Sequence, residues 1–349
     1  MTAEALVARH AILNVLACHS RGVDRADANL LGSAYHPDAT VDYGFFAGEA
    51  AVLVTILAGA QKGALPTLHR TANVDIRVDG RRAVSESYVI AYAEEAEVQR
   101  TIFGRYLDRL ECRDGRWALS HRTYVLDGNT NRASTVSRSD PPVIYDHYVP
   151  EGSKGASDPG QALIAHHLAA SRTLQKAKPM SVDAAILDAA LSRDAIRQLV
   201  TGYSRGVDRG DKALLKSLFW DDSVVISGLV NASGADFAEG IVDHVVTNLD
   251  YCFHSIANEW IEVTGDHAVG EHYVIANMCA GGQDVMTGGR YIDSYERRAG
   301  VWKIASRTFV ADWNTSHPKS LELDGMYQPL KTRGSFGTSD PVYAHWASL

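Results

Sequence analysis

The 349-residue sequence has few cysteines and none of the long apolar runs that membrane helices need. Its four cysteines form no CxxC pair, so we expect reduced thiols and neither a disulfide framework nor a zinc site. Positive charge is also scarce. Lys and Arg number 34 against 42 Asp and Glu, and the net charge of −8 argues against a nucleic-acid partner or an anionic membrane surface. The N-terminus lacks a secretory signal pattern, so we expect a cytoplasmic protein.

Motifs for nucleotide binding and for nucleophilic hydrolysis are missing as well. There is no GxGxxG, no P-loop and no GxSxG. His166 and His167 have no carboxylate or cysteine partner at a usable spacing, so we predict no metal site. Acid–base chemistry by side chains is what remains, and we expect no cofactor.

What the sequence does contain is a long internal repeat. RGVDR occurs at residues 21–25 and again at 205–209, and the tails GSKGASDP and GSFGTSDP also correspond. HxxxN begins at both His69 and His254, and GRYxD recurs too. The period is far too long for a solenoid. We therefore predict domain 1 at 1–133, a tail and linker at 134–183, domain 2 at 184–315, and a C-terminal tail at 316–349.

Each copy is predicted to begin with helices and to continue with strands. Apolar residues at spacings of three and four predict an amphipathic helix running into each RGVDR segment, with a short second helix at 28–35 and 212–219. β-type runs follow, such as 83–91 and 117–126, and RDGR at 113–116 is a hairpin signal. This order predicts an α+β fold.

The ordered set RGVD, HxxxN and RYxDxxExRxGxW, found twice, resembles the nuclear transport factor 2-like superfamily in its SnoaL-like branch. The resemblance spans roughly residues 5–128 and 189–313. It implies two tandem cone-shaped α+β barrels, each with N-terminal helices on a curved antiparallel sheet around a pocket. The pattern is most similar to the hexachlorocyclohexane dehydrochlorinase type, where an Asp–His dyad removes a proton without a cofactor and an Arg assists. These roles fall on Asp24, His69 and Arg122 in the first copy, and on Asp208, His254 and Arg307 in the second.

Elementary chemistry supports these roles. A carboxylate that accepts a hydrogen bond from imidazole fixes its tautomer and stabilises the imidazolium, and histidine titrates near neutral pH. His69 and Asn73 lie four apart on a predicted strand and should share a face. The same side chains could instead cap turns, form ion pairs or fill the core. The candidate substrate-binding residues are His19, Tyr43, Asn73, Tyr88, Tyr124, Tyr203, Asn258 and Tyr273.

The resemblance implies a cofactor-independent lyase. It would eliminate water, halide or formaldehyde from a small, aromatic substrate, a lignin-derived diarylpropane diol being one candidate. Two alternatives stay open, namely an isomerase or cyclase of polyketide or steroid type, and a non-catalytic module for a hydrophobic ligand. We expect a small-molecule partner and an internal pseudo-dimer of the two copies, with further homo-oligomerisation left open. The tails at 140–160 and 325–349 are candidate lids, over their own pocket or the other copy's.

Overall fold

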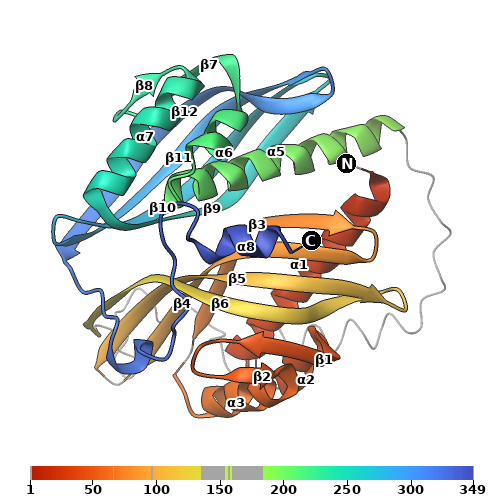
Figure 1. Ribbon diagram of the computed structural model, residues 1–349, viewed down its shortest axis with the longest axis vertical. Coiled ribbons are helices and arrows are strands. Elements are labelled where there is room, and N and C mark those ends of the chain that lie inside the picture. Colours follow the sequence, from red (N-terminus) through yellow and green to blue (C-terminus); the bar gives the residue numbers. More distant parts are fainter. Residues whose placement is uncertain are drawn as a thin grey trace.

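The computed structural model describes residues 2–65, 67–95, 97–134, 154–155, 158 and 184–348. Within them lie two units of one architecture, each with three helices and a six-stranded sheet (Figure 1). We call residues 2–134 copy one and residues 184–318 copy two. The predicted α+β fold and its duplication are confirmed. Most of the predicted linker at 134–183, with His166 and His167, lies outside the described residues, and the domain boundaries stay predictions.

Copy one starts with helices and ends in four long strands. Its elements are α1 (Ala3–Asp24), α2 (Ala28–Ser33), β1 (Tyr35–Asp42), β2 (Ala47–Glu49), α3 (Ala50–Lys62), β3 (Leu68–Asp79), β4 (Arg82–Glu95), β5 (Val98–Arg113) and β6 (Arg116–Ala133). The sheet order is β2-β1-β6-β5-β4-β3, in which β1 and β6 are parallel and the other neighbours antiparallel. The long curved sheet wraps around the helices and leaves one face turned inward.

Copy two repeats this order. Its elements are α5 (Ala184–Asp208), α6 (Lys212–Ser217), β7 (Phe219–Ile226), β8 (Asn231–Ala232), α7 (Gly234–Asn248), β9 (Leu249–Thr264), β10 (His267–Ala280), β11 (Gln283–Arg298) and β12 (Val301–Pro318), followed by η3 (Gly325–Tyr327) and α8 (Pro341–Trp346). Helices α3 and α7 are not predicted from the sequence pattern. Their glycines and β-branched residues lower helix propensity, and packing under the sheet overrides it.

Each first helix ends at the aspartate of its RGVDR segment. Ala26 (φ 53°) and Gly210 (φ 64°) take the left-handed conformation that terminates a helix. Asp27 then caps α2 by accepting a hydrogen bond from the Leu30 N–H at 2.9 Å. A side chain at Gly22 would meet the Leu31 backbone at 2.6 Å, so only glycine allows α2 to cross α1 this closely. This geometry fixes the aspartate in the last helical turn.

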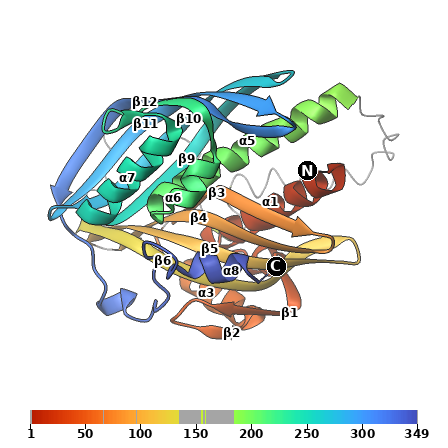
Figure 2. The ribbon, with the colours of Figure 1, turned by 45° about the horizontal axis from the view of Figure 1, so that its top comes forward.

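The C-terminal tail of the chain returns to copy one. Figures 1 and 2 both show α8 lying over β4 and β5, beside α6 of copy two. Val342 and Trp346 of α8 pack on Val84, Leu107 and Val125 of the copy-one sheet. Among the described helices, none is long and apolar enough to cross a membrane.

A buried group of charges joins the two copies. The Arg105 guanidinium, fully buried, donates to Asp340 at 2.7 and 2.8 Å, to Asp127 at 2.9 Å and to Glu86 at 3.0 Å. Arg209 of copy two adds a bond of 3.0 Å to Asp127. Burial opposes ionisation of Asp340, but Arg105 prevails and lowers the pKa of this carboxyl to about 2. Removing one partner from such a group typically costs about 3–5 kcal/mol, and the copies therefore form a firm internal pseudo-dimer.

Candidate functional site

The Asp–His pair of copy one is formed. The Oδ1 atom of Asp24 lies 2.7 Å from Nδ1 of His69, and its Oδ2 accepts the His69 backbone N–H at 2.9 Å. The Thr67 hydroxyl donates to the same Oδ1 at 3.1 Å. Three contacts thus fix the carboxylate, which in turn keeps the Nδ1 proton on the imidazole. This tautomer leaves Nε2 of His69 as the basic nitrogen.

His69 faces a cavity inside the cone of copy one. The cavity has a volume of about 210 Å³. Its lining is mostly apolar and aromatic, with the polar edges of His19, Tyr43, Tyr106 and Tyr124 exposed to it. Tyr43 stacks on Tyr124 with ring centroids 5.8 Å apart, which makes one wall flat. An apolar chamber with a few convergent polar groups is the usual form of a small-molecule site.

A second imidazole lies at the end of this cavity. His19 of α1 is buried between two phenols, with Nδ1 3.2 Å from the Tyr35 hydroxyl and Nε2 3.4 Å from the Tyr43 hydroxyl. Burial, the charge of Arg122 and His69 hold the pKa of His19 well below its ordinary value. His19 is therefore neutral at physiological pH. It can relay hydrogen bonds to Tyr43, but it does not compete with His69 for a proton.

The roof of the cavity comes from the far end of the chain. Met326, Tyr327 and Leu330 line it, although they follow the last strand of copy two. The segment is held by hydrogen bonds from the Leu126 N–H to the Thr332 carbonyl and from the Tyr327 hydroxyl to Asn131, at 3.0 and 2.8 Å. The C-terminal tail is thus a lid over the cavity of the other copy, one of the two arrangements considered from the sequence.

Copy two keeps the dyad but changes its surroundings. Nδ1 of His254 lies 2.6 Å from Oδ1 of Asp208, whose side chain is fully buried. The position of His19 is taken by Tyr203, which stacks on Phe237 at 6.0 Å and contacts Tyr291 at 5.3 Å. Phe309, in place of Tyr124, packs on Tyr291. Aromatic rings thus pack closely in the interior of copy two, and the His254 side chain keeps 13% exposure against 18% for His69.

The protonation of His254 also departs from what a base requires. Burial disfavours its charged form, but Cys252 and the Asp208 carboxylate outweigh burial and raise the pKa of His254 well above its ordinary value. Asp208 and His254 therefore form a charge-assisted pair that is largely buried.

The two predicted arginines lie beneath the pockets. Arg122 donates to both oxygens of Asp108 at 2.6 and 2.8 Å, and its guanidinium carbon sits 4.0 Å from the centre of the Tyr106 ring. Arg307 pairs with Asp293 at 2.8 and 2.7 Å in the same way. Both arginine side chains are buried. Arg122 reaches the cavity through Tyr106 and through its charge, and is best described as a positioning residue.

Five of the predicted substrate-binding residues lie away from this cavity, and one of them, Tyr203, belongs to the core of copy two. Asn73 sits at a bulge of β3 in the left-handed conformation (φ 46°), so the alternation that should place it beside His69 is broken. Its amide instead donates to the His254 carbonyl and accepts the Ile256 N–H. Tyr88 packs on Phe253 in the contact between copies, and Tyr273 and Asn258 are exposed on copy two.

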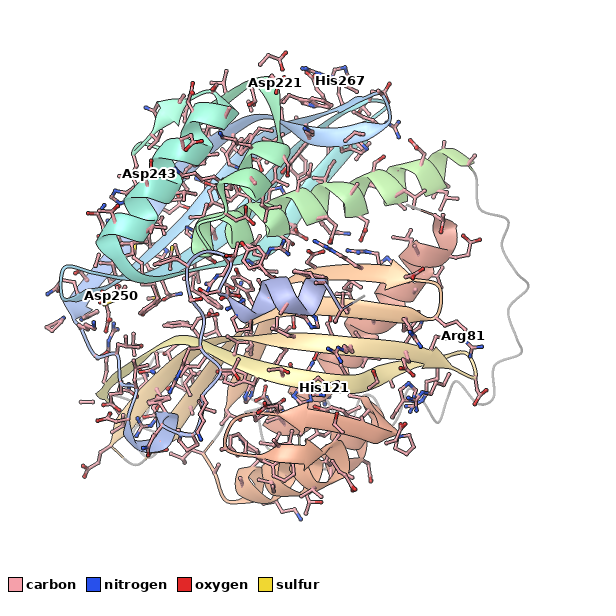
Figure 3. All side chains as sticks on the ribbon, viewed as in Figure 1. Arg81, His121, Asp221, Asp243, Asp250 and His267 are labelled. Atoms are coloured by element: carbon pink, nitrogen blue, oxygen red, sulfur yellow. The ribbon has the colours of Figure 1, made fainter. Side chains whose placement is uncertain are left out.

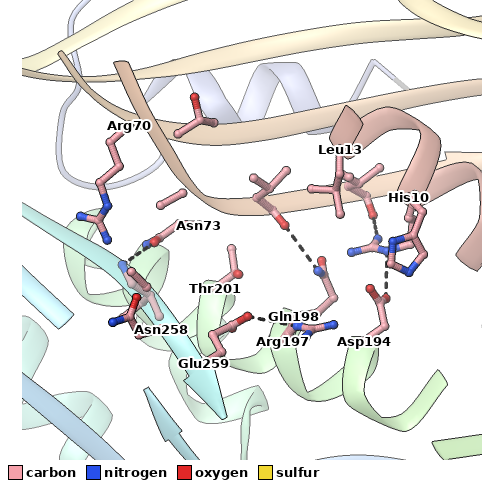
Figure 4. Close-up of a pocket in the computed structure, with 17 residues that line it drawn as sticks. His10, Leu13, Arg70, Asn73, Asp194, Arg197, Gln198, Thr201, Asn258 and Glu259 are labelled. Carbon is pink, nitrogen blue, oxygen red and sulfur yellow. Dashed lines mark hydrogen bonds and ion pairs between the residues drawn. The ribbon is translucent and has the colours of Figure 1, made fainter. Parts of the chain in front are cut away.

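Asn73 and Asn258 line a different hollow, of about 510 Å³, between α1 and β3 of copy one and α5 and β9 of copy two (Figure 4). Its charged groups pair largely with one another. Arg197 donates to Glu259 at 3.0 Å, and Arg9 lies 2.9 Å from Asp194. This hollow serves as a polar joint between the copies, and His10 lies at its edge.

In the described part of the chain, one group of side chains has metal-ligand chemistry, namely Asp208, Cys252 and His254. Two of its donor atoms, Asp208 Oδ1 and His254 Nδ1, already share a hydrogen bond of 2.6 Å. The acidic side chains labelled in Figure 3 on copy two, Asp221 and Asp243 among them, come from separate elements and lie well apart. We assign no metal site to these residues.

Sequence reasoning missed the supports of the dyad. Thr67 links Asp24 to the Gln61 side chain at 2.9 Å, and Lys154 of the first tail donates to that same Gln61 oxygen. The repeated tail motif was the available signal, since it marks segments that dock next to the dyads.

The comparisons with known proteins agree with this architecture. A model of the SnoaL-like domain matches residues 4–123 and again residues 188–308. The gamma-hexachlorocyclohexane dehydrochlorinase of Sphingobium indicum is 28% identical over 134 residues, covering 37% of this chain and 86% of that protein. Hexachlorocyclohexane dehydrochlorinase 1 of the same species is 29% identical, covering 34% and 80%. Among solved structures, LinA has a TM-score of 0.35 at 28% identity, covering 37% of this chain and 90% of that one.

Proposed function

We propose that this chain, which belongs to the SnoaL-like domain family through both of its copies, is a lyase that performs an elimination in the cavity of copy one. The matched relatives are dehydrochlorinases, which supports an elimination. The observation that carries the proposal is the difference between the dyads. His69 lines an apolar cavity of copy one, whereas its counterpart His254 lies beside a cluster of packed rings and has a raised pKa.

In the proposed reaction His69 is the general base. Its Nε2 takes a proton from a carbon or hydroxyl of the substrate, the electron pair forms a new double bond, and the leaving group departs with its own bonding pair. Asp24 stabilises the imidazolium that forms, which is the role of a buried carboxylate on Nδ1. General-base catalysis of this kind typically contributes about 10²–10⁴-fold.

The polar end of the cavity would receive the departing group. The Tyr43 hydroxyl is oriented by His19 and lies in the field of Arg122, whose charge opposes the effect of burial on the pKa of Tyr43. Burial dominates and raises that pKa, so the phenol stays protonated and can donate a hydrogen bond. A neutral donor aimed at developing negative charge stabilises the transition state more than the ground state.

The cavity volume limits the substrate. A cavity of about 150 Å³ holds one benzene, so the 210 Å³ found here suits a single substituted ring. A two-ring diarylpropane diol would need the Met326 lid to move. Water and halide are leaving groups that this space accommodates without such a movement.

The test is a mass-resolved product screen with halogenated rings, hydroxylated aromatic rings, a ketosteroid and a diarylpropane diol. Wild type is compared with His69→Gln and with His254→Gln as the matched control. Loss of water, halide or formaldehyde with wild type and His254→Gln, but not with His69→Gln, is the expected result. A product of unchanged mass would show an isomerase. Equal activity of His69→Gln and wild type would refute the proposed base.

A further inference from the structure

Apart from contacts of α1 with α5 and of β3 with β9, the contact between the two copies joins unlike surfaces. Copy one contributes the outer face of its sheet, the face turned away from the cavity. Copy two contributes the end of α5, the start of β9 and the C-terminal tail. Tyr88 and Phe103 of the sheet pack on Phe253, with ring centroids 4.8 and 5.6 Å apart. A contact between unlike surfaces of repeated units leaves one surface of each kind at the two ends, and these can join further units.

The corresponding outer face of copy two is exposed and apolar. We define it by Val269, Tyr273, Ile292 and Trp313, which are 45–47% exposed. The counterparts of Tyr273 and Ile292 in copy one are Tyr88 and Leu107, at an offset of 185, and these are only 1% and 3% exposed because copy two and its tail cover them. Aromatic and aliphatic side chains gathered on one exposed sheet face are characteristic of an interaction surface.

The charges of the contact are repeated on this face as well. Arg290 donates to Asp312 at 3.0 Å and to Glu271 at 3.4 Å. These residues are the counterparts of Arg105, Asp127 and Glu86, and they are partly exposed here. In copy one, the same group is buried because Arg209 of copy two reaches Asp127.

Copy one retains the complementary surface. Arg25 and Asp158, the counterparts of Arg209 and Asp340, lie 3.5 Å apart. The backbone of each tail docks identically, since the Gly155 N–H donates to the Arg25 carbonyl as the Gly337 N–H donates to the Arg209 carbonyl, at 2.6 and 2.7 Å. At the position of Phe253, copy one presents Leu68, which is 55% exposed.

Copy two has a hollow on its outer face that could accept the copy-one surface around Leu68. A hollow of about 380 Å³ lies between Tyr273, Gly288 and Trp313. Exposed Asn258 lies at the rim of this hollow and has the same left-handed φ of 46° as Asn73. In the contact between the copies, Asn73 binds the backbone of β9 through its side-chain amide. Several elements of the existing contact therefore have a counterpart elsewhere in the chain, exposed Leu68 and Tyr273 among them.

We propose that the outer face of copy two binds the α1–β3 surface of a second copy of this chain, around Leu68 and Arg25, so that chains associate head to tail. Arg25 would approach Asp312 as Arg209 approaches Asp127. Whether the assembly closes into a ring depends on the rotation between successive copies.

Light scattering during size-exclusion chromatography, over a range of concentrations, tests this association with the full chain. We expect wild type to exceed the chain mass of 37.9 kDa by a whole multiple. Ile292→Arg should reduce it to a single chain, because it places a charge at the centre of the apolar face. Val301→Arg is the matched control, since Val301 is equally exposed but lies in the β11–β12 hairpin. A single-chain mass for wild type at all concentrations overturns the proposal.

Mixing two defective variants identifies the geometry. Ile292→Arg lacks a working outer face, and Leu68→Arg lacks the complementary surface. Neither should assemble alone, yet a mixture should give a one-to-one complex, because each chain supplies the surface that the other has lost. Complex formation also shows that both variants are folded. If the mixture stays at the mass of a single chain while the Val301→Arg control assembles, the head-to-tail contact is refuted.

Discussion

Replacing Asp208 by Asn should destabilise the protein far more than the same change at Asp24. Asp208 is fully buried and accepts the His254 Nδ1–H at 2.6 Å and the His254 backbone N–H at 2.8 Å. Asn keeps the shape but removes the charge that favours protonated His254. The imidazole then loses its proton, and a charge-assisted hydrogen bond in a largely buried site is replaced by a weaker neutral contact.

The size of this effect follows from the burial of the pair. Breaking a buried ion pair by removing one partner typically costs about 3–5 kcal/mol. At Asp24 the histidine lies on a cavity, and the Thr67 hydroxyl remains to satisfy one oxygen. There the loss resembles that of ordinary hydrogen bonds, about 1–2 kcal/mol. We therefore expect the free energies of unfolding of the two variants to differ by roughly 2 kcal/mol or more.

Tryptophan fluorescence during urea unfolding is a suitable assay. Trp220, Trp260, Trp302 and Trp313 all belong to copy two, so four of the six tryptophans report on the unit that Asp208 stabilises. With slopes of about 1–3 kcal/mol per molar urea, the Asp208→Asn midpoint should fall by more than about 1 M, and the Asp24→Asn midpoint by much less. Equal shifts for both variants would refute the division into a structural and a catalytic dyad.

Three further predictions follow from individual contacts. The pKa of folded His254 lies above its unfolded value of about 6.5. The protonated His254 therefore stabilises the folded protein fully below that value, and this contribution is lost as pH rises, by at most about 1.4 kcal/mol per pH unit. His254→Gln should flatten the resulting decline in urea midpoints measured from about pH 6.5 upward. Identical pH profiles for wild type and variant would contradict the raised pKa. Tyr43→Phe should lower kcat about tenfold or more through loss of one donor in the transition state, with thermal stability little changed; an unaltered kcat would remove Tyr43 from the proposed site. Asp340→Ala should destabilise the contact between the C-terminal tail and copy one by about 3 kcal/mol and speed proteolytic cleavage after Pro318. If the variant is cleaved as slowly as wild type, Arg105 does not need Asp340 as a partner.

The repeated motifs were sufficient to predict the duplication, and the resemblance to the dehydrochlorinase pattern led to the pairing of Asp24 with His69. In the structure the RGVD segment ends a helix, and Asp24 accepts the N–H of the histidine near the start of β3. The position of Asn73 was not predictable, because a single bulge in β3 changes which face the side chain occupies. The tail that carries Met326 was a candidate lid, but which pocket it covers was left open, because more than 250 residues separate Met326 from His69 and no local pattern encodes that contact.

The persistence of the second dyad has a physical explanation that does not require a second active site. Asp208 and His254 are largely buried beside a packed aromatic cluster, and losing either one leaves the other without its partner. Such a pair contributes to stability whether or not it acts on a substrate. A packed copy two is also a firmer base for the tail that roofs copy one, whereas a cavity would weaken it. In the proposed division, the copy without a cavity contributes to catalysis by holding the lid of the copy that has one.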